Sequence, residues 1–256
     1  MNKNYLNDIK NSIQESELVV IGLGEEWNVS PDVQTSEAFL RMQEDLAAKP
    51  EFRWLLPYFY VKWTDDNLTK AYENLFRLLE GKNYYVVATT VNRSFVPFVQ
   101  NERFVMPCGT EEYLCEETLK NSADYPEFLE SLDAYLNGDI TFDEIKFVRN
   151  DVGQVIPFNN IYASGYKEDG YLAQWGKYMK WLQGTMNRKT CLLELGAGLQ
   201  FPSVFRFPFE KMAYFNRKAV CFRVHKTLFH LTAEMAERSK SVPIHAVELF
   251  AEEVTE

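Results

Sequence analysis

Two pairs of glycines follow apolar runs, and they are the residues of this sequence best suited to chemistry. Gly22 and Gly24 end the run LVVIGLG. Gly196 and Gly198 follow the run TCLLEL. Glycines after a buried strand let the backbone approach a phosphate closely, and the start of a following helix offers unpaired N–H groups. The pattern indicates a phosphate site, although a plain tight turn after each strand explains it too.

Acidic residues next to each glycine pair change what the loops could bind. Glu25 and Glu26 directly follow the first pair, and two carboxylates beside a pyrophosphate repel it unless they point away. Glu194 precedes the second pair, which by itself is similar to the first motif of S-adenosylmethionine-dependent methyltransferases. That fold needs several further strands, and the rest of the chain has room for about two. Of the two glycine loops, the second is the stronger indication of a phosphate site.

Charge and hydropathy exclude some partners. The chain has 256 residues, with 27 basic and 37 acidic side chains and a net charge of -10. This charge repels a phosphodiester backbone, and no basic cluster offsets it, so we expect no nucleic-acid partner. The apolar stretches are strand-sized, and the N-terminal residues lack the apolar core of a signal peptide. We therefore expect a cytoplasmic protein that does not bind membranes.

Cysteines and histidines give little support for a metal or a catalytic centre. The four cysteines form no C-x-x-C pair, so neither a zinc site nor a disulfide framework is indicated. All three histidines lie near the end of the chain, and His225 ends an expected strand. Cys108 precedes a glycine, and its thiol could act as a base only if its pKa were lowered. A buried apolar role is the simpler interpretation of Cys108.

Alternating strands and helices surround these residues. We expect strands over residues 18–24, 83–90, 103–107, 190–198, 219–224 and 241–244. We expect helices over residues 3–16, 33–47, 66–80 and 126–136, the last of them stopped by Asn137 and Gly138. This order predicts an α/β fold with a Rossmann-like parallel sheet made of residues 1–110 and 185–256. Residues 111–184 are expected to form an inserted helical small domain without zinc.

In chain order, several segments resemble the sirtuin family, and specifically the bacterial sirtuins associated with macrodomains, whose hallmark is protein ADP-ribosylation in place of deacylation. VVIGLG resembles the first strand and its glycine loop, and NYYVVATTVNRSF resembles the strand that ends in T-T-N-V-D-x-x-F. LLELGAGLQFPSVFRFPFEKMAYFN resembles the late L-E-L-G-x-G-x-N-T-P segment with its P-F-E continuation. NRKAVCFRVH resembles the strand that ends in an Asn near the nucleotide.

The resemblance implies an NAD or ADP-ribose site and also shows departures from the family. The nucleotide would be held by Gly22, Gly24, Gly196, Ala197, Gly198, Gln200 and His225. Chemistry at the nicotinamide ribose would lie near Thr90, Asn92 and Cys108. Thr90 and Asn92 stand where the family has the asparagine and aspartate of its motif, and Cys108 stands where it has His or Gln. The four zinc cysteines of the family's small domain are missing as a set.

Three functions stay open at this point. One is an active NAD-dependent ADP-ribosyltransferase or NAD hydrolase, which would cleave the glycosidic bond through an oxocarbenium-like sugar. Another is a pseudoenzyme that keeps the sheet as a binding or interaction module, with a protein partner or substrate. The last is an S-adenosylmethionine-dependent methyltransferase.

Overall fold

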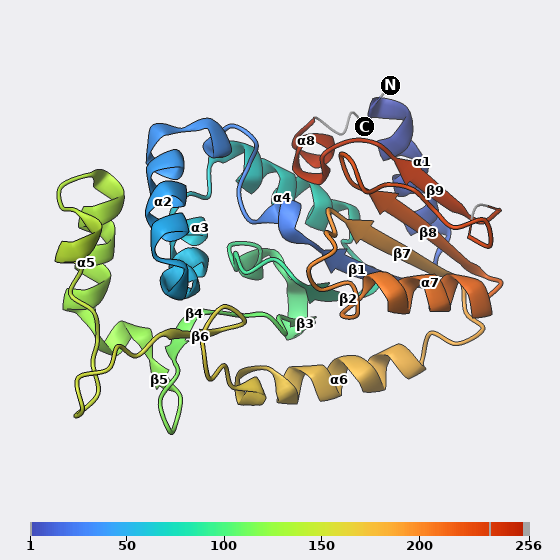
Figure 1. Cartoon of the computed structure of the whole chain (residues 1–256). Coiled ribbons are helices and arrows are strands. Elements are labelled where there is room, and N and C mark those ends of the chain that lie inside the picture. The colour runs from blue at the N-terminus through green and yellow to red at the C-terminus, as the bar shows by residue number, and fades with distance from the viewer. Residues whose placement is uncertain (1, 236, 253–256) are drawn as a thin grey trace.

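The computed structural model describes residues 2–235 and 237–252, and its centre is a parallel sheet of six strands in the order β3-β2-β1-β7-β8-β9 (Figure 1). The strands are β1 (Leu18–Leu23), β2 (Asn83–Ala88), β3 (Phe104–Val105), β7 (Thr190–Leu195), β8 (Ala219–Val224) and β9 (Ser239–Val242). Every residue of β1 and β7 is buried. Both faces of the sheet are covered, which explains why these strands read as unbroken apolar runs.

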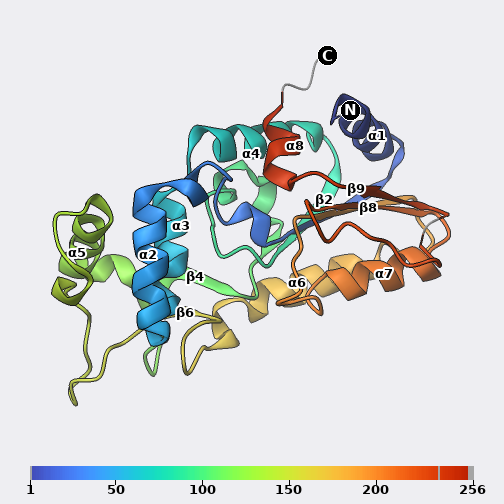
Figure 2. The same ribbon diagram turned by 45° about the horizontal axis from the view of Figure 1, so that its top comes forward.

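Helices cover the two faces of this sheet. On one face lie α1 (Asn2–Glu15), α4 (Asp66–Leu78) and α8 (Ala246–Ala251), and on the other lie α6 (Leu172–Gln183) and α7 (Arg206–Phe215) (Figures 1 and 2). The alternation of side chains along β1 divides the core, because Val19 and Ile21 pack with the first group and Val20 with the second. The predicted parallel α/β sheet is confirmed.

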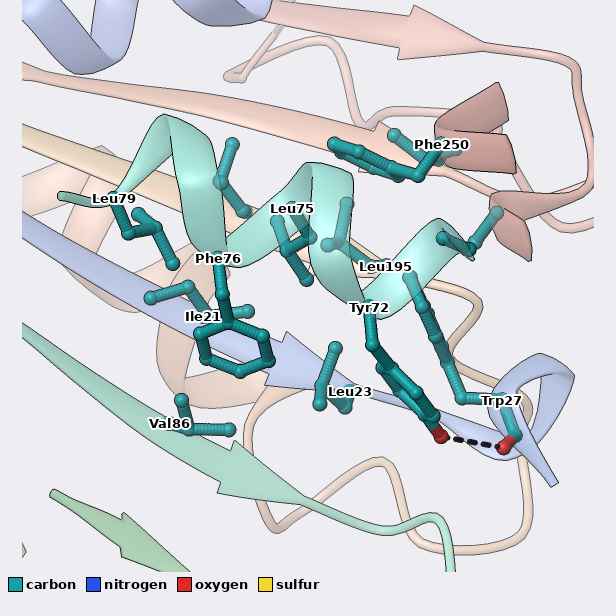
Figure 3. Packing of buried hydrophobic residues seen from close by; sticks show 14 of the residues in the cluster. Ile21, Leu23, Trp27, Tyr72, Leu75, Phe76, Leu79, Val86, Leu195 and Phe250 are labelled. Atoms are coloured by element: carbon teal, nitrogen blue, oxygen red, sulfur yellow. Dashed lines mark hydrogen bonds between the residues drawn. The ribbon is translucent and has the colours of Figure 1, made fainter. Parts of the chain in front are cut away.

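The core on the face covered by α1, α4 and α8 anchors the chain that leaves β1. The Tyr72 hydroxyl on α4 donates a hydrogen bond to the Trp27 carbonyl oxygen at 3.1 Å, and the two rings stack with centroids 5.0 Å apart (Figure 3). Asp65 caps α4 by accepting from the Leu68 N–H at 2.8 Å, and it also accepts from the Ser30 hydroxyl. The loop after β1 is therefore held at Trp27 and at Ser30.

A second, aromatic core lies beside the sheet. Its helices are α2 (Glu37–Ala48), α3 (Leu56–Lys62) and α5 (Pro126–Asn137), and its small antiparallel sheet consists of β4 (Gly109–Leu114), β5 (Lys120–Asn121) and β6 (Phe158–Asn160). Trp54 packs against the rings of Phe128 and Phe158 at its centre. The sequence did not predict this small sheet, because β5 and β6 are very short and β4 shows no clear alternation of buried and exposed residues.

The second core mixes two parts of the chain. Its buried residues come from positions 29–60 as well as from positions 91–163. Helix α6, in contrast, packs on the large sheet, where Tyr178 lies 5.2 Å from the ring of Tyr85. The division of the chain at residues 110 and 184 stays a prediction.

Most helix limits follow local signals in the sequence. Helix α2 begins after Ser36, whose hydroxyl accepts from the Phe39 N–H, and so it starts later than expected. Gly138 ends α5 in the left-handed conformation with φ 82°. Short 3-10 helices occupy Glu25–Trp27, Val33–Thr35, Pro50–Leu55, Val96–Phe98, Gln100–Glu102, Ser122–Asp124, Phe142–Glu144 and Glu168–Gly170.

Two glycines should respond in opposite ways to replacement by alanine. Gly138→Ala should lower the free energy of unfolding by about 1 kcal/mol, because an L residue is strained at φ 82°. Gly176→Ala inside α6 should raise it by up to about 1 kcal/mol, because alanine favours a helix and its Cβ meets no atom within 4 Å. Urea unfolding of both variants tests this, and shifts of the same sign would contradict it.

Candidate functional site

The two glycine loops meet at the carboxyl ends of β1 and β7. These strands are neighbours, and the sheet order places them where strand connections diverge to opposite faces, the usual ligand site of an open α/β sheet. The Gly24 N–H donates to the Leu195 carbonyl oxygen at 2.8 Å, and the Glu26 N–H donates to the Gly196 carbonyl oxygen at 3.2 Å. The structure thus brings the two predicted loops together.

The glycines of these loops serve close packing of the loops themselves. A Cβ added at Gly24 would lie 2.2 Å from the Gly196 carbonyl oxygen. At Gly196, where φ is 69°, an added Cβ would lie 2.6 Å from the Cβ of Glu26. At Gly22 it would lie 2.3 Å from the ring of Phe205. Protein atoms therefore already occupy the space next to these three glycines.

The carboxylates of Glu25 and Glu26 point into the site and not away from it. Glu25 Oε2 accepts from the Gly198 N–H at 2.5 Å. Glu26 accepts from the Lys226 N–H at 3.0 Å and, through its other oxygen, from the Ala246 N–H at 2.8 Å. These backbone donors are the kind that would hold a phosphate. As placed, the residues do not fit the pyrophosphate of NAD or ADP-ribose.

Glu26 and His225 form a partly buried contact at the edge of the site. Burial raises the pKa of Glu26 to about 7, although the N–H donors of Lys226 and Ala246 oppose that rise. Burial lowers the pKa of His225 to about 4, so its ring is neutral at pH 7. The His225 Nδ1 atom accepts N–H groups of its own loop and lies 3.3 Å from Glu26. The contact is therefore not an ion pair at neutral pH, and Nδ1 is already occupied.

Thr90 and Asn92, which follow β2, are fully buried and bonded to the protein itself. The Thr90 hydroxyl donates to Asn28 Oδ1 at 2.9 Å. The Asn92 side-chain amide donates to the carbonyl oxygens of Asn28 and Tyr60, each at 2.9 Å, and to the Thr64 hydroxyl. Both side chains thus hold the loop after β1, and Asn92 also ties that loop to α3.

Cys108 is buried in the second core. Burial, with a smaller contribution from the nearby Glu25 carboxylate, raises the pKa of its thiol far above the ordinary value. The thiol is therefore protonated at neutral pH and cannot serve as a general base as it stands. That Thr90, Asn92 and Cys108 take part in catalysis stays a prediction.

A polar cavity of about 480 Å³ opens beside Glu25. Its lining includes Glu25, Asn28, Arg53, Tyr162 and Gln200. The Arg53 guanidinium lies 5.4 Å from the centre of the Tyr162 ring. Of the residues predicted for the site, Gln200 lines this cavity. Sequence patterns did not indicate Arg53 or Tyr162, because the cavity joins segments that are distant along the chain.

Glu194, the acidic residue before the second loop, belongs to a buried network of charged side chains. Glu194 accepts from Arg206 at 3.0 Å and from Arg223 at 2.8 Å, and Arg223 also binds Glu210 at 2.7 Å. Arg206 donates to the Ala197 carbonyl oxygen at 3.1 Å. A cofactor bound through Glu194, as the methyltransferase interpretation requires, would have to replace these guanidinium partners.

Neither a metal-binding cluster nor a membrane-spanning helix occurs within the described ranges, 2–235 and 237–252. No group of three or more His, Cys, Asp or Glu side chains there is arranged to hold a metal ion. No helix in the same part of the chain is long and apolar enough to cross a membrane. That the protein has no zinc stays a prediction.

Comparisons with known proteins point to one fold. No family model matches the chain. It is 21% identical over 260 residues to a protein ADP-ribosyltransferase of Staphylococcus aureus (strain Mu50 / ATCC 700699), covering 90% of this chain and 81% of the relative. Sir2Tm bound to a propionylated peptide matches with a TM-score of 0.54 at 16% identity, over 98% of this chain and 96% of that one. A Sir2 homologue in complex with NAD matches with a TM-score of 0.52 at 13% identity, over 96% and 91%.

The pKa of Glu26 predicts a pH effect on stability. A carboxyl whose folded pKa is raised from 4.5 to about 7 stabilises the fold fully below about pH 4.5, and this contribution is lost as the pH rises through 7. The stability of the wild type relative to Glu26→Gln should therefore fall across this window, by on the order of 3 kcal/mol. Urea unfolding at a series of pH values measures the difference.

Glu144 is the matched control for this experiment. Hydrogen bonds from the backbone and side chain of Thr141 lower the pKa of Glu144, which is exposed. Its stabilising contribution is present above the ordinary pKa of a glutamate and is lost as the pH falls. The wild type should therefore gain stability relative to Glu144→Gln as the pH rises. The same slope for both variants would contradict the assignment to Glu26.

Replacing Asn92 by the aspartate of the sirtuin motif should destabilise this chain. In Asn92→Asp an oxygen would face the carbonyl oxygens of Asn28 and Tyr60, which now accept from the amide. We expect a loss of about 3 kcal/mol or more in the free energy of unfolding. Asn121→Asp is the control, because the exposed Asn121 side chain only accepts, from the Ala123 N–H, and an aspartate can do the same. Equal stability of the two variants would refute the structural role of Asn92.

Proposed function

We propose that this chain, which has the fold of the sirtuins, is a catalytically inactive binding module built on that fold. The fold and the resemblance to sirtuins expected from the sequence are confirmed by the structural matches. The observation that carries the proposal is the placement of Thr90, Asn92 and Cys108. The first two bind the loop after β1, and the third is a buried, protonated thiol.

Cleavage of a glycosidic bond needs groups that are free to position an acceptor and to take a proton in the reacting complex. The side chains of Thr90 and Asn92 would have to give up buried hydrogen bonds to do so, and leaving the buried partner atoms unsatisfied is costly. The Cys108 thiol would have to ionise against its burial. The arrangement therefore favours a structural role for all three residues.

The cavity beside Glu25 supports the binding role. It is lined by a carboxylate, the Arg53 guanidinium, the amides of Asn28 and Gln200, and the phenol ring of Tyr162. Its polar residues come from the chain after β1, from the segments around Arg53 and Tyr162, and from the chain after β7. It suits a small polar ligand that carries donors and acceptors of its own.

A second candidate is an NAD or ADP-ribose protein that transfers ADP-ribose or hydrolyses NAD. It is supported by the name of the relative, a protein ADP-ribosyltransferase, and by matches to Sir2 homologues solved with NAD and with ADP-ribose. This function requires Glu25 and Glu26 to release the N–H groups that they now hold. For either function, we also propose that the protein is bacterial and cytoplasmic.

A nicotinamide-release assay on the purified protein separates the two candidates. We expect release from NAD to stay at the level of a protein-free blank. Release above the blank that is abolished in Thr90→Ala would make the protein an enzyme and overturn the proposal. Calorimetric titration with S-adenosylmethionine serves as the parallel test of the methyltransferase alternative, and we expect no binding up to about 1 mM.

A further inference from the structure

We propose that Glu25 and Glu26 are built-in ligands of the nucleotide loops and exclude phosphate-bearing molecules from this cleft. The inference rests on the proposed binding role and specifies what the cleft rejects. It makes these two glutamates the residues that determine specificity.

The geometry shows how the two carboxylates replace an anion. The donors come from three separate places: Gly198 in the second glycine loop, Lys226 after β8, and Ala246 at the start of α8. One anion can join two of them, because the N–H groups of Lys226 and Ala246 bind the two oxygens of the single Glu26 carboxylate. Here the two adjacent glutamates join them, and the three segments are linked to the loop after β1.

Packing keeps the two carboxylates in place. Gly24 contacts Gly196 closely, and the Glu26 side chain covers Gly196 where an added Cβ would lie. The Glu26 N–H donates to the Gly196 carbonyl oxygen, so backbone and side chain of this residue hold different segments. A phosphate group cannot reach the same N–H groups while the carboxylates hold them.

Charge acts in the same direction as packing. Any phosphate that bound these donors would lie within a few ångströms of two acidic side chains at a partly buried edge, where repulsion between like charges is strong. The exclusion therefore has two parts, occupied donors and repulsion. Replacement by alanine removes both of them, whereas replacement by glutamine removes the charge and keeps an acceptor.

Calorimetric titration at pH 8 with inorganic pyrophosphate and with ADP-ribose tests the inference. The proteins are the wild type, Glu25→Ala, Glu25→Gln and Glu26→Gln, each checked for folding by circular dichroism. We expect no binding to the wild type up to about 1 mM, and a gain of roughly tenfold or more in affinity for Glu25→Ala, the effect of one hydrogen bond to a charged group. The glutamine variants should gain less.

Glu248→Ala is the matched control. Glu248 is exposed and its charge acts on Glu26, but no backbone N–H of the site is bonded to it. This variant removes one negative charge from the same region without freeing a donor, so its affinity for pyrophosphate should stay that of the wild type.

In the Glu25→Ala variant, added pyrophosphate should shift the amide resonance of Gly198, which locates the bound anion.

Several outcomes would overturn the inference. Binding of ADP-ribose or pyrophosphate by the wild type would do so without any variant. The same holds if the folded Glu25 variants gain no affinity, or if Glu248→Ala gains as much as they do. Should Glu25→Ala not fold, Glu25→Gln and the wild type still decide the question. ADP-ribose binding without nicotinamide release would overturn this inference alone, whereas nicotinamide release would overturn the proposed function.

Discussion

The parallel, in-register pairing of β1 with β7 sets the geometry of the whole site. Leu18 pairs with Thr190 and Leu23 pairs with Leu195, so both strands end at the same level. The glycine loops that follow them are therefore forced into contact, and only glycine can fill Gly24 and Gly196 at this separation. Because the loops meet, the glutamates that follow the first loop lie within reach of the second loop and of the chain after β8.

The buried charge network around Glu194 holds the second loop and its surroundings. Arg206 on α7 joins Glu194, the Ala197 carbonyl oxygen and the Leu228 carbonyl oxygen, and so it links the chain after β7 to the chain after β8. Removing one member would leave an uncompensated buried charge, which costs far more than an exposed pair contributes. The network thus holds the segments of two donors that the glutamates engage, Gly198 beside Ala197 and Lys226 near Leu228.

The fold alone does not determine what this edge of the sheet binds. Sirtuin matches extend over nearly the whole chain, yet the polar groups after β2 bind protein atoms, and the loop amides bind glutamates. Function depends on the groups that a site leaves free for a ligand and not on the fold alone. A polar cavity whose lining includes Arg53 and Tyr162 lies beside Glu25.

The sequence by itself determined the parallel sheet with its six strands and the helices α1, α2, α4 and α5, because apolar periodicity and glycine stops such as Gly138 are local signals. It also identified the two glycine loops and raised the question of where Glu25 and Glu26 point. Only the tertiary structure answered it, since Glu25 contacts a residue 173 positions away and Glu26 one that is 220 positions away. The internal bonds of Asn92, the small sheet and the cavity likewise depend on contacts between distant segments, and no local pattern of residue types records such contacts.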